Sequence, residues 1–463
     1  MRIIRIVSAT VWCLTVFGGL PARAATLDVQ RFGAKGDGVS LDSDAVNRAI
    51  EACAKSGGGQ VRFPAGRYLC ATIQLKSHSH LWLEAGAVIV GSPDPEKYSS
   101  YSPPKEAPEA KFGARWHRAL IIGDSVEDVS IQGPGVIDGN KVFDARGEER
   151  MRGPHTILIG NSRDISIRGV SIRDSANYAV LLEGCDDVRV RGVRITGGWD
   201  GIHFRGWPGR PCRRVSITDC QLFTGDDSIA GRYWEDTLIS GCVLNSSCNG
   251  IRLIGPASRL TIHGCLMYGP GLYEHRSSHR NNMLAGLCLQ PGAWDATTGA
   301  MENVDVSDVT MHNVTTPLFC VMKPGNTATG ITVSRLTATG VYLTASSIES
   351  WAESPIRNMT LSDVTVAFRR ERKGANGSAG RVRGPGVDAR PLPCWGLYAR
   401  NVENLRLANV RFTDDTEEDT PAIICENVRG LSLDGVRCPP DVKPPVFTGV
   451  ERLTARDVSP PLP

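Results

Sequence analysis

Beyond its first 24 residues, the sequence has no apolar run long enough to cross a membrane. The part after residue 24 also lacks net charge. The formal charge of +3 belongs to residues 1–24, which contain three arginines and no acid, and the remainder has 49 basic and 49 acidic side chains. Such a balance gives no overall field of the kind that marks nucleic-acid binding. We therefore expect no nucleic-acid partner and no membrane partner. A polyanion would have to bind to a local cluster of basic side chains.

The sequence also lacks cysteines and histidines at the spacing of a zinc site. Of the 14 cysteines, 13 follow residue 24, and they form no CxxC pair or Cys/His cluster with zinc spacing. Many of them recur at one position of a repeat, which favours a packing role. Export would permit disulfides, but the sequence does not assign them. We predict no metal and no other cofactor.

The one long apolar run stands at the start of the chain. Arg2 and Arg5 precede an apolar stretch over residues 6–20, and Ala22-Arg23-Ala24 supplies a small-residue cleavage pattern. Fifteen apolar residues are few for a membrane anchor. The pattern predicts a signal peptide over 1–24, a mature chain over 25–463 and a secreted or periplasmic protein.

What the sequence does contain is a repeat. Short alternating runs such as "DVSI" at 128, "DISI" at 164, "DVRV" at 187 and "RVSI" at 214 recur at intervals that cluster between 22 and 28 residues. No helical crossover separates them, and the consensus of leucine-rich repeats is missing. The pattern predicts an all-β fold, a parallel β-helix in which each repeat is one coil and alternate side chains fill the bore.

The ends of a solenoid must be capped. Residues 42–55 have apolar residues at helical spacing, with Ser40 or Asp42 as the N-cap and glycines behind, and predict an amphipathic cap helix within a cap region of about 25–70. The Gly-rich, basic stretch 368–393 predicts a loop within one domain over 25–463.

The stretch "LFTGDDSIAGR", residues 222–232, carries the chemistry. Three segments align so that one apolar residue of each points into the bore, and two positions earlier each has an acid or amide. The apolar residues are Ile202, Ile229 and Ile251, and the polar ones are Asp200, Asp227 and Asn249. Because neighbouring coils lie about 4.8 Å apart, these polar residues should form a ladder with Asp226 beside it. We expect one exposed cluster of carboxylates.

Basic residues should flank this cluster. His203, Arg205, Arg232 and Arg252 are expected to project from the same side, and such an arrangement on a concave outer face is typical of a groove for a polymer. The alternative is structural, because Asp and Asn ladders also stabilise β-solenoids without any catalytic role.

The sequence resembles glycoside hydrolase family 28, the polygalacturonase-like enzymes, over nearly the whole mature chain. "FGAKGDGVSLDSDAVNRAIEAC" is similar to the family's N-terminal signature, and Gly225-Asp226-Asp227 matches its Gly-Asp-Asp motif completely. The resemblance implies a right-handed, pectin-lyase-type β-helix. It also implies hydrolysis with inversion, in which Asp226 is the general acid and Asp200 and Asp227 hold and deprotonate the water.

Two departures from the family bear on the substrate. The family's Gly-His-Gly is Cys248-Asn249-Gly250 here, and Cys288 and Gln290 stand where its basic pair belongs. That pair is associated with a uronate carboxylate in the family. Arg252, or the insertion over 273–282, offers substitute charge. The resemblance implies an acidic or pectin-type polysaccharide, but the two departures argue against galacturonate and leave a neutral or mixed substrate, such as a rhamnogalacturonan-type chain, equally open.

Three functions compete. The first is a secreted hydrolase, with Asn249, His203, Arg205, Arg232, Arg252 and Gln290 as substrate-binding residues. The second is a polysaccharide lyase, which would use Arg210 or Arg213 as its base and often calcium. The third is a non-catalytic carbohydrate-binding β-helix, because fold alone does not give function. A monomer is expected in each case.

Overall fold

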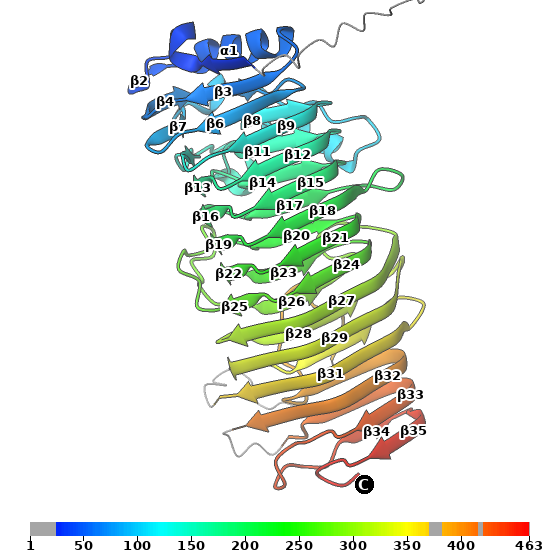
Figure 1. Ribbon diagram of the computed structural model, residues 1–463. Coiled ribbons are helices and arrows are strands. Elements are labelled where there is room, and N and C mark those ends of the chain that lie inside the picture. Colours follow the sequence, from blue (N-terminus) through cyan, green and yellow to red (C-terminus); the bar gives the residue numbers. More distant parts are fainter. Residues whose placement is uncertain (1–24, 370–381, 415–419, 463) are drawn as a thin grey trace, which may run out of the picture.

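The computed structural model describes residues 25–369, 382–414 and 420–462. The predicted signal peptide lies outside the described residues. Over them the chain forms a right-handed parallel β-helix, in which the strands stack in rungs from α1 at one end to β35 at the other (Figure 1). The predicted fold class is confirmed. Within the described residues, no helix has both the length and the apolar character that a membrane crossing needs.

Each coil contributes strands to three faces. The first, called the site face below, is built from β5 (Ile73–Gln74), β8 (Ala119–Asp124), β11 (His155–Gly160), β14 (Val180–Glu183), β17 (Ile202–Arg205), β20 (Ile229–Arg232), β23 (Asn249–Leu253), β26 (Ala285–Leu289), β28 (Thr316–Met322), β30 (Ser346–Ser350), the first parts of β32 (Leu397–Asp414) and β33 (Ile423–Asp434), and β34 (Val446–Thr448). Neighbouring strands of this face pair in parallel.

The second face extends over most of the length of the molecule. It consists of β1 (Ala25–Asp28), β3 (Gly59–Phe63), β6 (Ser79–Leu83), β9 (Glu127–Gln132), β12 (Arg163–Arg168), β15 (Asp186–Arg191), β18 (Cys212–Thr218), β21 (Trp234–Ser240), β24 (Ala257–His263), β27 (Gly299–His312), β29 (Asn326–Val341), β31 (Ile356–Phe368), the later parts of β32 and β33, and β35 (Glu451–Arg456).

The third face closes the coils of the first part of the molecule. It consists of β2 (Asp37–Leu41), β4 (Gly66–Cys70), β7 (Ala87–Gly91), β10 (Val136–Asp138), β13 (Ser171–Arg173), β16 (Arg194–Thr196), β19 (Gln221–Thr224), β22 (Val243–Ser246) and β25 (Leu266–Tyr268). The later part of β27 continues it.

The bore is packed with the apolar residues of the repeat. Ile202, Ile229 and Ile251 stand in register on β17, β20 and β23, and none of them is exposed. Full burial of such a side chain is worth about 1.5–3 kcal/mol, so the column of stacked residues stabilises every coil against its neighbours. The 13 cysteines of the described residues are all buried and free, which confirms their packing role.

The acid that opens each repeated run has a backbone role. Asp128, Asp164 and Asp187 begin "DVSI", "DISI" and "DVRV", and their φ angles are 52°, 52° and 55°. Asp and Asn tolerate this left-handed conformation better than other residues with side chains, which explains their recurrence at the start of these strands. Arg214 has the same conformation, with φ 52°, in "RVSI".

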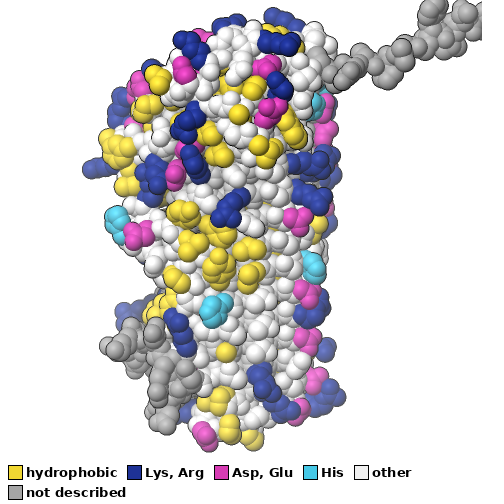
Figure 2. All heavy atoms as spheres, turned by 60° about the vertical axis from the view of Figure 1, so that its left-hand side comes forward, with side chains coloured by type: hydrophobic (Ala, Val, Ile, Leu, Met, Phe, Trp, Pro, Cys, Tyr) yellow, Lys and Arg dark blue, Asp and Glu magenta, His cyan; other side chains and the backbone are white. Residues whose placement is uncertain are grey.

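Ion pairs between coils cover part of the surface. Arg214 contacts Asp187 at 2.7 Å, and Arg335 contacts Asp308 at 2.6 Å. Basic and acidic side chains are interspersed along the right-hand edge of the molecule in Figure 2. Each exposed pair contributes about 0–1 kcal/mol, so these contacts leave the surface balanced in charge without dominating stability.

The cap helix α1 (Ser43–Lys55) lies across the first coils, as predicted. Val46, Ala49 and Ile50 turn to the end of the bore and are not exposed. Asp42 is the N-cap residue, but its carboxylate does not cap the helix. It accepts hydrogen bonds from the backbone N–H groups of Lys35 and Gly36, at 2.7 and 3.0 Å, and so ties the incoming loop to the helix start.

Five short helices lie outside the rungs or in loops. They are η1 (Val29–Phe32), η2 (Pro95–Lys97), η3 (Pro108–Phe112), α2 (Gly113–Trp116) and η4 (Glu148–Arg150). Three of them, η2, η3 and α2, belong to the segment 93–118 between β7 and β8. The predicted loop 368–393 begins where β31 ends, its residues 370–381 lie outside the described residues, and residues 382–393 contain no helix or strand.

Candidate active site

Three carboxylates meet where the turns before the site face stack on one another. Asp226 and Asp227 occupy the turn between β19 and β20, and Asp200 occupies the equivalent turn one coil earlier. Backbone bonds connect the rungs, since Gly201 N–H donates to Asp227 O at 2.9 Å and Ser228 N–H donates to Asn249 O at 3.0 Å. The ladder that the sequence alignment predicts is therefore formed.

The Gly-Asp-Asp turn is fixed from three sides. The hydroxyls of Thr224 and Ser246 each donate to the carbonyl of Asp226 at 2.7 Å. A Cβ at Gly225 would lie 2.4 Å from the carbonyl oxygen of Gly198 on the preceding coil, so only glycine fits before the two acids. The backbone thus presents both carboxylates in one orientation.

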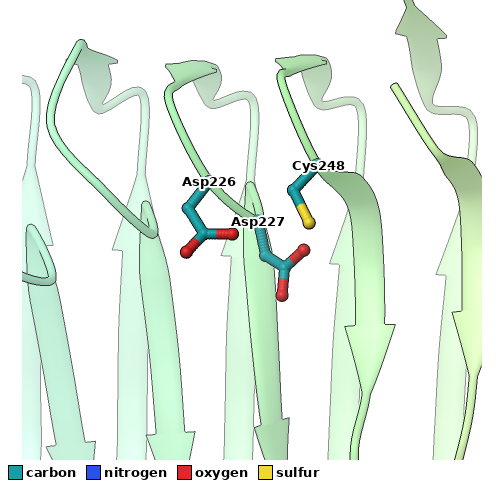
Figure 3. A group of neighbouring side chains, drawn as sticks. All are labelled: Asp226, Asp227 and Cys248. Carbon is teal, nitrogen blue, oxygen red and sulfur yellow. The ribbon is translucent and has the colours of Figure 1, made fainter. Parts of the chain in front are cut away.

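Asp227 faces the next coil. Asn249 donates to its Oδ1 from the side-chain amide at 2.8 Å and from the backbone at 3.1 Å, while Arg252 Nη1 lies 3.7 Å from Oδ2. Figure 3 shows Asp226, Asp227 and Cys248 converging on one space, and one ligand atom of each lies within 4.8 Å of the others.

Asp200 faces His203. The His203 Nδ1 lies 2.5 Å from Asp200 Oδ2, and the ring stacks on Tyr178 at 4.4 Å between centroids. Burial, followed by the charges of Arg205 and Arg232, holds the pKa of His203 well below its usual range, so the ring is neutral. The His203 Nε2 is buried with no hydrogen-bond partner among the described residues.

Asp226 faces two basic groups that the sequence analysis did not assign. Arg152 Nη2 lies 3.4 Å from Asp226 Oδ2, and His275 Nε2 lies 3.6 Å from the same oxygen. Arg152 stacks on Trp199 at 3.7 Å and also contacts Glu149 at 2.5 Å. No motif marked Arg152, whereas the insertion 273–282 that carries His275 was singled out as a source of positive charge.

Hydrogen bonds define the tautomer of His275. The backbone N–H of Ser278 donates to its Nδ1 at 3.3 Å, and the hydroxyl of Ser278 lies 3.0 Å from the same atom. A backbone N–H can only donate, so Nδ1 accepts and the proton of the neutral ring is on Nε2. The proton of His275 is therefore directed at Asp226.

The three carboxylates have different proton affinities. Burial, together with the neighbouring Asp226 and Asp227, raises the pKa of Asp200 well above its usual range. Burial also raises the pKa of Asp227, against the opposing charge of Arg252. Burial by itself would raise the pKa of Asp226, but His275, Arg152 and Arg252 outweigh it and hold this pKa below the usual range.

The expectation of an exposed cluster is wrong. The exposed fractions of the side chains are 5% for Asp200, 8% for Asp227 and 13% for Asp226. The cause is that loops absent from the repeat, including 273–282 and the segment before β11, fold over the turns. Asp226 is the most accessible of the three.

The predicted basic residues do project from one side of the site face, but they are buried and paired within the protein. Arg205 and Arg232 contact Glu109 and Asp295. They pair with each other in register, two residues beyond the register position that His203 and Arg252 share. The expected open groove for a polymer is therefore not present at these residues, because loop carboxylates cover them.

The positions of the family's basic pair are also closed. The amide of Gln290 accepts from Arg252 Nη2 at 3.3 Å and donates to the carbonyl of Gly386 at 2.6 Å. Cys288 pairs in register with Arg252, and neither Cys288 nor Gln290 is more than 1% exposed. Gln290 thus orients Arg252 rather than facing open space.

The carboxylates and Cys248 could in principle ligate a cation. Cations of the protein already face them, since Arg280 Nη2 lies 3.0 Å from Cys248 Sγ and Arg252 lies beside Asp227. Burial raises the pKa of the Cys248 thiol well above its usual range, whereas a metal ligand must be deprotonated. The donor set therefore favours proton transfer over metal binding.

Comparison with known proteins agrees with this geometry. The model of "Glycosyl hydrolases family 28" matches residues 108–252, and that of "Rhamnogalacturonase A/epimerase, pectate lyase-like" matches residues 26–96. A probable polygalacturonase of Vitis vinifera is 24% identical over 420 residues, which cover 85% of this chain and 84% of that protein. The chain is similar to the polygalacturonases of glycosyl hydrolase family 28.

Other similar proteins show how broadly this fold is used. The family 28 exopolygalacturonase of Yersinia enterocolitica shares the fold with a TM-score of 0.57 at 15% identity, covering 95% of this chain and 80% of that one. The plasmin and fibronectin-binding protein A of Streptococcus pneumoniae is 32% identical over 182 residues, which cover 37% of this chain and 24% of that protein. The family 28 match includes Asp200, Asp226 and Asp227, and it supports a glycosyl hydrolase.

Proposed function

We propose that this protein is an exported hydrolase that cleaves glycosidic bonds in an acidic or pectin-type polysaccharide. The observation that carries the proposal is the convergence of Asp200, Asp226 and Asp227 on stacked turns, with Asp226 the most accessible. Acid–base hydrolysis of a glycoside requires one protonated and one ionised carboxyl group. In the free protein the order of pKa values is the reverse of these roles, since the pKa of Asp226 is lowered and those of Asp200 and Asp227 are raised. The similarity to family 28 supports the same chemistry.

In this proposal Asp226 donates a proton to the glycosidic oxygen, and Asp200 and Asp227 hold and deprotonate the attacking water. Asp226 suits contact with the sugar because its side chain is the most exposed of the three. Inversion follows from the family resemblance rather than from the spacing, since oxygens of Asp226 and Asp227 lie within 4.8 Å, closer than the ~6.5–9.5 Å typical of an inverting acid–base pair.

The donor must be protonated when it acts. Arg152 and His275 stabilise the ionised form of Asp226 in the free protein. An anionic sugar bound beside them would share their positive charge and exclude water, and both effects raise the pKa of Asp226. We therefore propose that Asp226 becomes an effective acid in the substrate complex.

The cations around Asp226 favour a uronate over a neutral sugar. The guanidinium of Arg276, from the same insertion as His275, lies 5.9 Å from the Trp199 ring, and its Nη1 is buried with no hydrogen-bond partner among the described residues. A buried, unpaired donor costs free energy unless a ligand accepts from it. A sugar carboxylate would supply that acceptor and replace the basic pair that Cys288 and Gln290 do not provide.

A polysaccharide panel tests the function. Homogalacturonan, rhamnogalacturonan and neutral controls are incubated with the protein, and new reducing ends are counted while absorbance near 235 nm reports unsaturated products. We expect reducing ends without absorbance. Rising absorbance would identify a lyase, and binding without either signal would identify a non-catalytic carbohydrate-binding β-helix.

The Asp226→Asn variant tests the site. It should lose about 10²–10⁴-fold in kcat while staying folded, because a single general acid typically supplies that factor. Its melting temperature should fall at neutral pH, where the ionised Asp226 contacts Arg152 and His275. An Asp164→Asn variant, altered at an exposed acid on the second face, is the matched control. Near-native turnover by Asp226→Asn would refute its assignment. Early NMR spectra of the products would test inversion, and sequencing the N-terminus of the exported protein would test cleavage after residue 24.

A further inference from the structure

The outer side of the site face is covered along the whole region around the carboxylates. In a polymer-binding groove, the outward residues of consecutive strands would be open to solvent. Here each of them is at most 7% exposed, from the N-terminal side to the C-terminal side: Ile122, Leu158, Leu181, Glu183, His203, Arg205, Ala230, Arg232, Arg252, Cys288, Phe319, Glu349 and Tyr398.

The segment 93–118 forms the cover on the N-terminal side. Its Trp116 packs edge-on against His155 on β11, with ring centroids 4.8 Å apart. Its Glu109 is fully buried and contacts both Arg232 and Arg205, the latter at 3.2 Å. A polymer lying along the site face would have to displace this carboxylate and leave two buried guanidinium groups unpaired, which is strongly unfavourable.

The region beneath this cover is closed to solvent. Glu183 projects outward from β14, is not exposed, and has no hydrogen-bond partner for either oxygen among the described residues. Burial, with the charge of Glu109 added, raises the pKa of Glu183 to about 8. His117 of the covering segment places its Nε2 3.9 Å from Glu183 Oε1, so the cover occupies the space that a sugar would need beside this carboxyl group.

The segment 382–390 forms the cover on the C-terminal side. The carbonyls of Gly386 and Val387 accept from Gln290 at 2.6 Å and from Arg252 at 2.9 Å. Arg390 contacts both oxygens of Glu349, at 3.0 and 2.6 Å, and its guanidinium lies 5.7 Å from the Phe319 ring. The site face is thus closed from β23 to β30, on the four coils that follow that of Asp227.

Between the two covers, the segment 291–297 contacts the arginines of the site face. Asp295 contacts Arg232, and this contact fixes the neighbouring Trp294, whose ring lies 5.5 Å from the guanidinium of Arg252. Trp294 is 69% exposed although its backbone is held by a buried ion pair. An aromatic ring held in this way at the edge of the site can receive the apolar face of a sugar.

We propose that the site is a closed-ended pocket that takes the end of a saccharide chain, so that the enzyme acts in exo fashion on polymers or on short oligosaccharides. The proposal rests on the proposed hydrolytic function and specifies its mode. The chain end reaches Asp226 from the side of the turns, where the acid is accessible, because 93–118 and 382–390 block passage along the site face in both directions.

The test uses the full-length protein and the polysaccharide that it cleaves in the panel. Size-exclusion chromatography of early time points should show mono- or disaccharide from the first minutes beside unshortened polymer. The viscosity should fall slowly relative to the number of reducing ends. A ladder of intermediate oligomers at low conversion, with a rapid fall in viscosity, would overturn the proposal.

End-blocked oligosaccharides sharpen the result. One set carries an unsaturated residue at the non-reducing end, and the other is reduced to the alditol at the opposite end. Blocking one of the two ends should abolish release of product, and cleavage of oligomers blocked at both ends would contradict a pocket. If neither polymer nor any oligomer is cleaved, the hydrolytic function fails and the exo mode falls with it, whereas internal cleavage refutes the exo mode alone.

A variant pair connects the mode to the cover. Glu109→Ala should loosen 93–118 and raise the ratio of internal to terminal cleavage at least severalfold, whereas Glu106→Ala, at an exposed position of the same segment, should leave the ratio unchanged. Circular dichroism and thermal melting control for folding. An unchanged ratio in a folded Glu109→Ala protein would refute the role of this cover, and the product pattern of the parent protein decides the mode even where that variant does not fold.

Discussion

Replacing His275 should move one limb of the pH–rate profile and reveal which role Asp226 has. The Nε2 of His275 lies 3.6 Å from Oδ2 of the ionised Asp226 and lowers the pKa of this acid. In His275→Ala the donor is lost and the pKa of Asp226 rises. A hydrogen bond to a charged group is worth about 1.5–3 kcal/mol, and one pKa unit corresponds to about 1.4 kcal/mol. Because Nε2 lies 3.6 Å from Oδ2, beyond hydrogen-bond distance, the effect should fall below this range, and we expect a shift of at most about one unit.

The direction of the moving limb is decisive. If Asp226 is the proton donor, kcat/KM falls as the pH rises through its pKa in the free protein, so His275→Ala should shift this descending limb to higher pH. Because binding raises the pKa of Asp226 in our proposal, the descending limb of kcat should lie at higher pH than that of kcat/KM. Movement of the ascending limb instead would make Asp226 the base and refute its assignment as acid.

Two further variants separate electrostatics from folding. His279→Ala removes a histidine whose side chain is 79% exposed on the same insertion, and it should leave both limbs in place. His275→Gln retains an N–H donor at the end of a side chain, and it should restore part of the lowered pKa. The titratable and charged groups that face Asp226 are Arg152, Arg252, His275, Arg280, Cys248 and the other two acids, and only His275 is altered. If neither limb moves in His275→Ala, the contact with Asp226 has no effect on its proton affinity.

The remaining predictions concern stability and binding. Asp200→Asn should inactivate the enzyme yet raise its melting temperature, and the difference from the parent should grow as the pH rises. Because the pKa of Asp200 is raised in the folded protein, the parent loses stability as the pH rises from the usual Asp pKa to the folded pKa. Asn does not ionise, so the variant has no such loss. A melting temperature equal to that of the parent across pH 4–8 would contradict this. Trp294→Ala should raise KM about 3–10-fold with little change in kcat, since a stacking platform contributes roughly 1 kcal/mol of uniform binding, and an unchanged KM would exclude sugar contact. Ile331→Ala, in the bore of β29 and not exposed, should cost about 2–5 kcal/mol in denaturant unfolding while leaving the activity per folded molecule intact.

The rungs could be predicted from the sequence because residues separated by one repeat lie next to each other on successive coils of a solenoid. Once Ile202, Ile229 and Ile251 are aligned as bore residues, the strand period of two fixes which neighbours face outward, and the rung distance brings Asp200, Asp227 and Asn249 together. The cap helix followed from its apolar spacing in the same way, to within one residue of its start.

The partners of these residues could not be predicted, because they come from segments outside the repeat. Glu109 is 123 positions from Arg232, and Arg152 is 74 positions from Asp226, with no periodic pattern connecting either pair. Long-range loop contacts depend on where an insertion folds back, and spacing does not encode that. The predicted open groove was wrong for this reason, since the repeat describes the site face and the loops decide whether it is open.

The division between rungs and loops also explains how a family motif can persist while its surroundings change. Gly225-Asp226-Asp227 is held by coil-to-coil contacts, and any side chain at Gly225 would collide with Gly198. The proton affinity of Asp226, by contrast, is set by His275 and Arg152, which lie on loops. In the family that this sequence resembles, a basic pair stands at the positions of Cys288 and Gln290. Here the insertion 273–282 supplies positive charge instead, and the stacked acids are unchanged. In our proposal, loop residues set the substrate and the mode of attack, and the variants of Glu109, His275 and Trp294 test that separation.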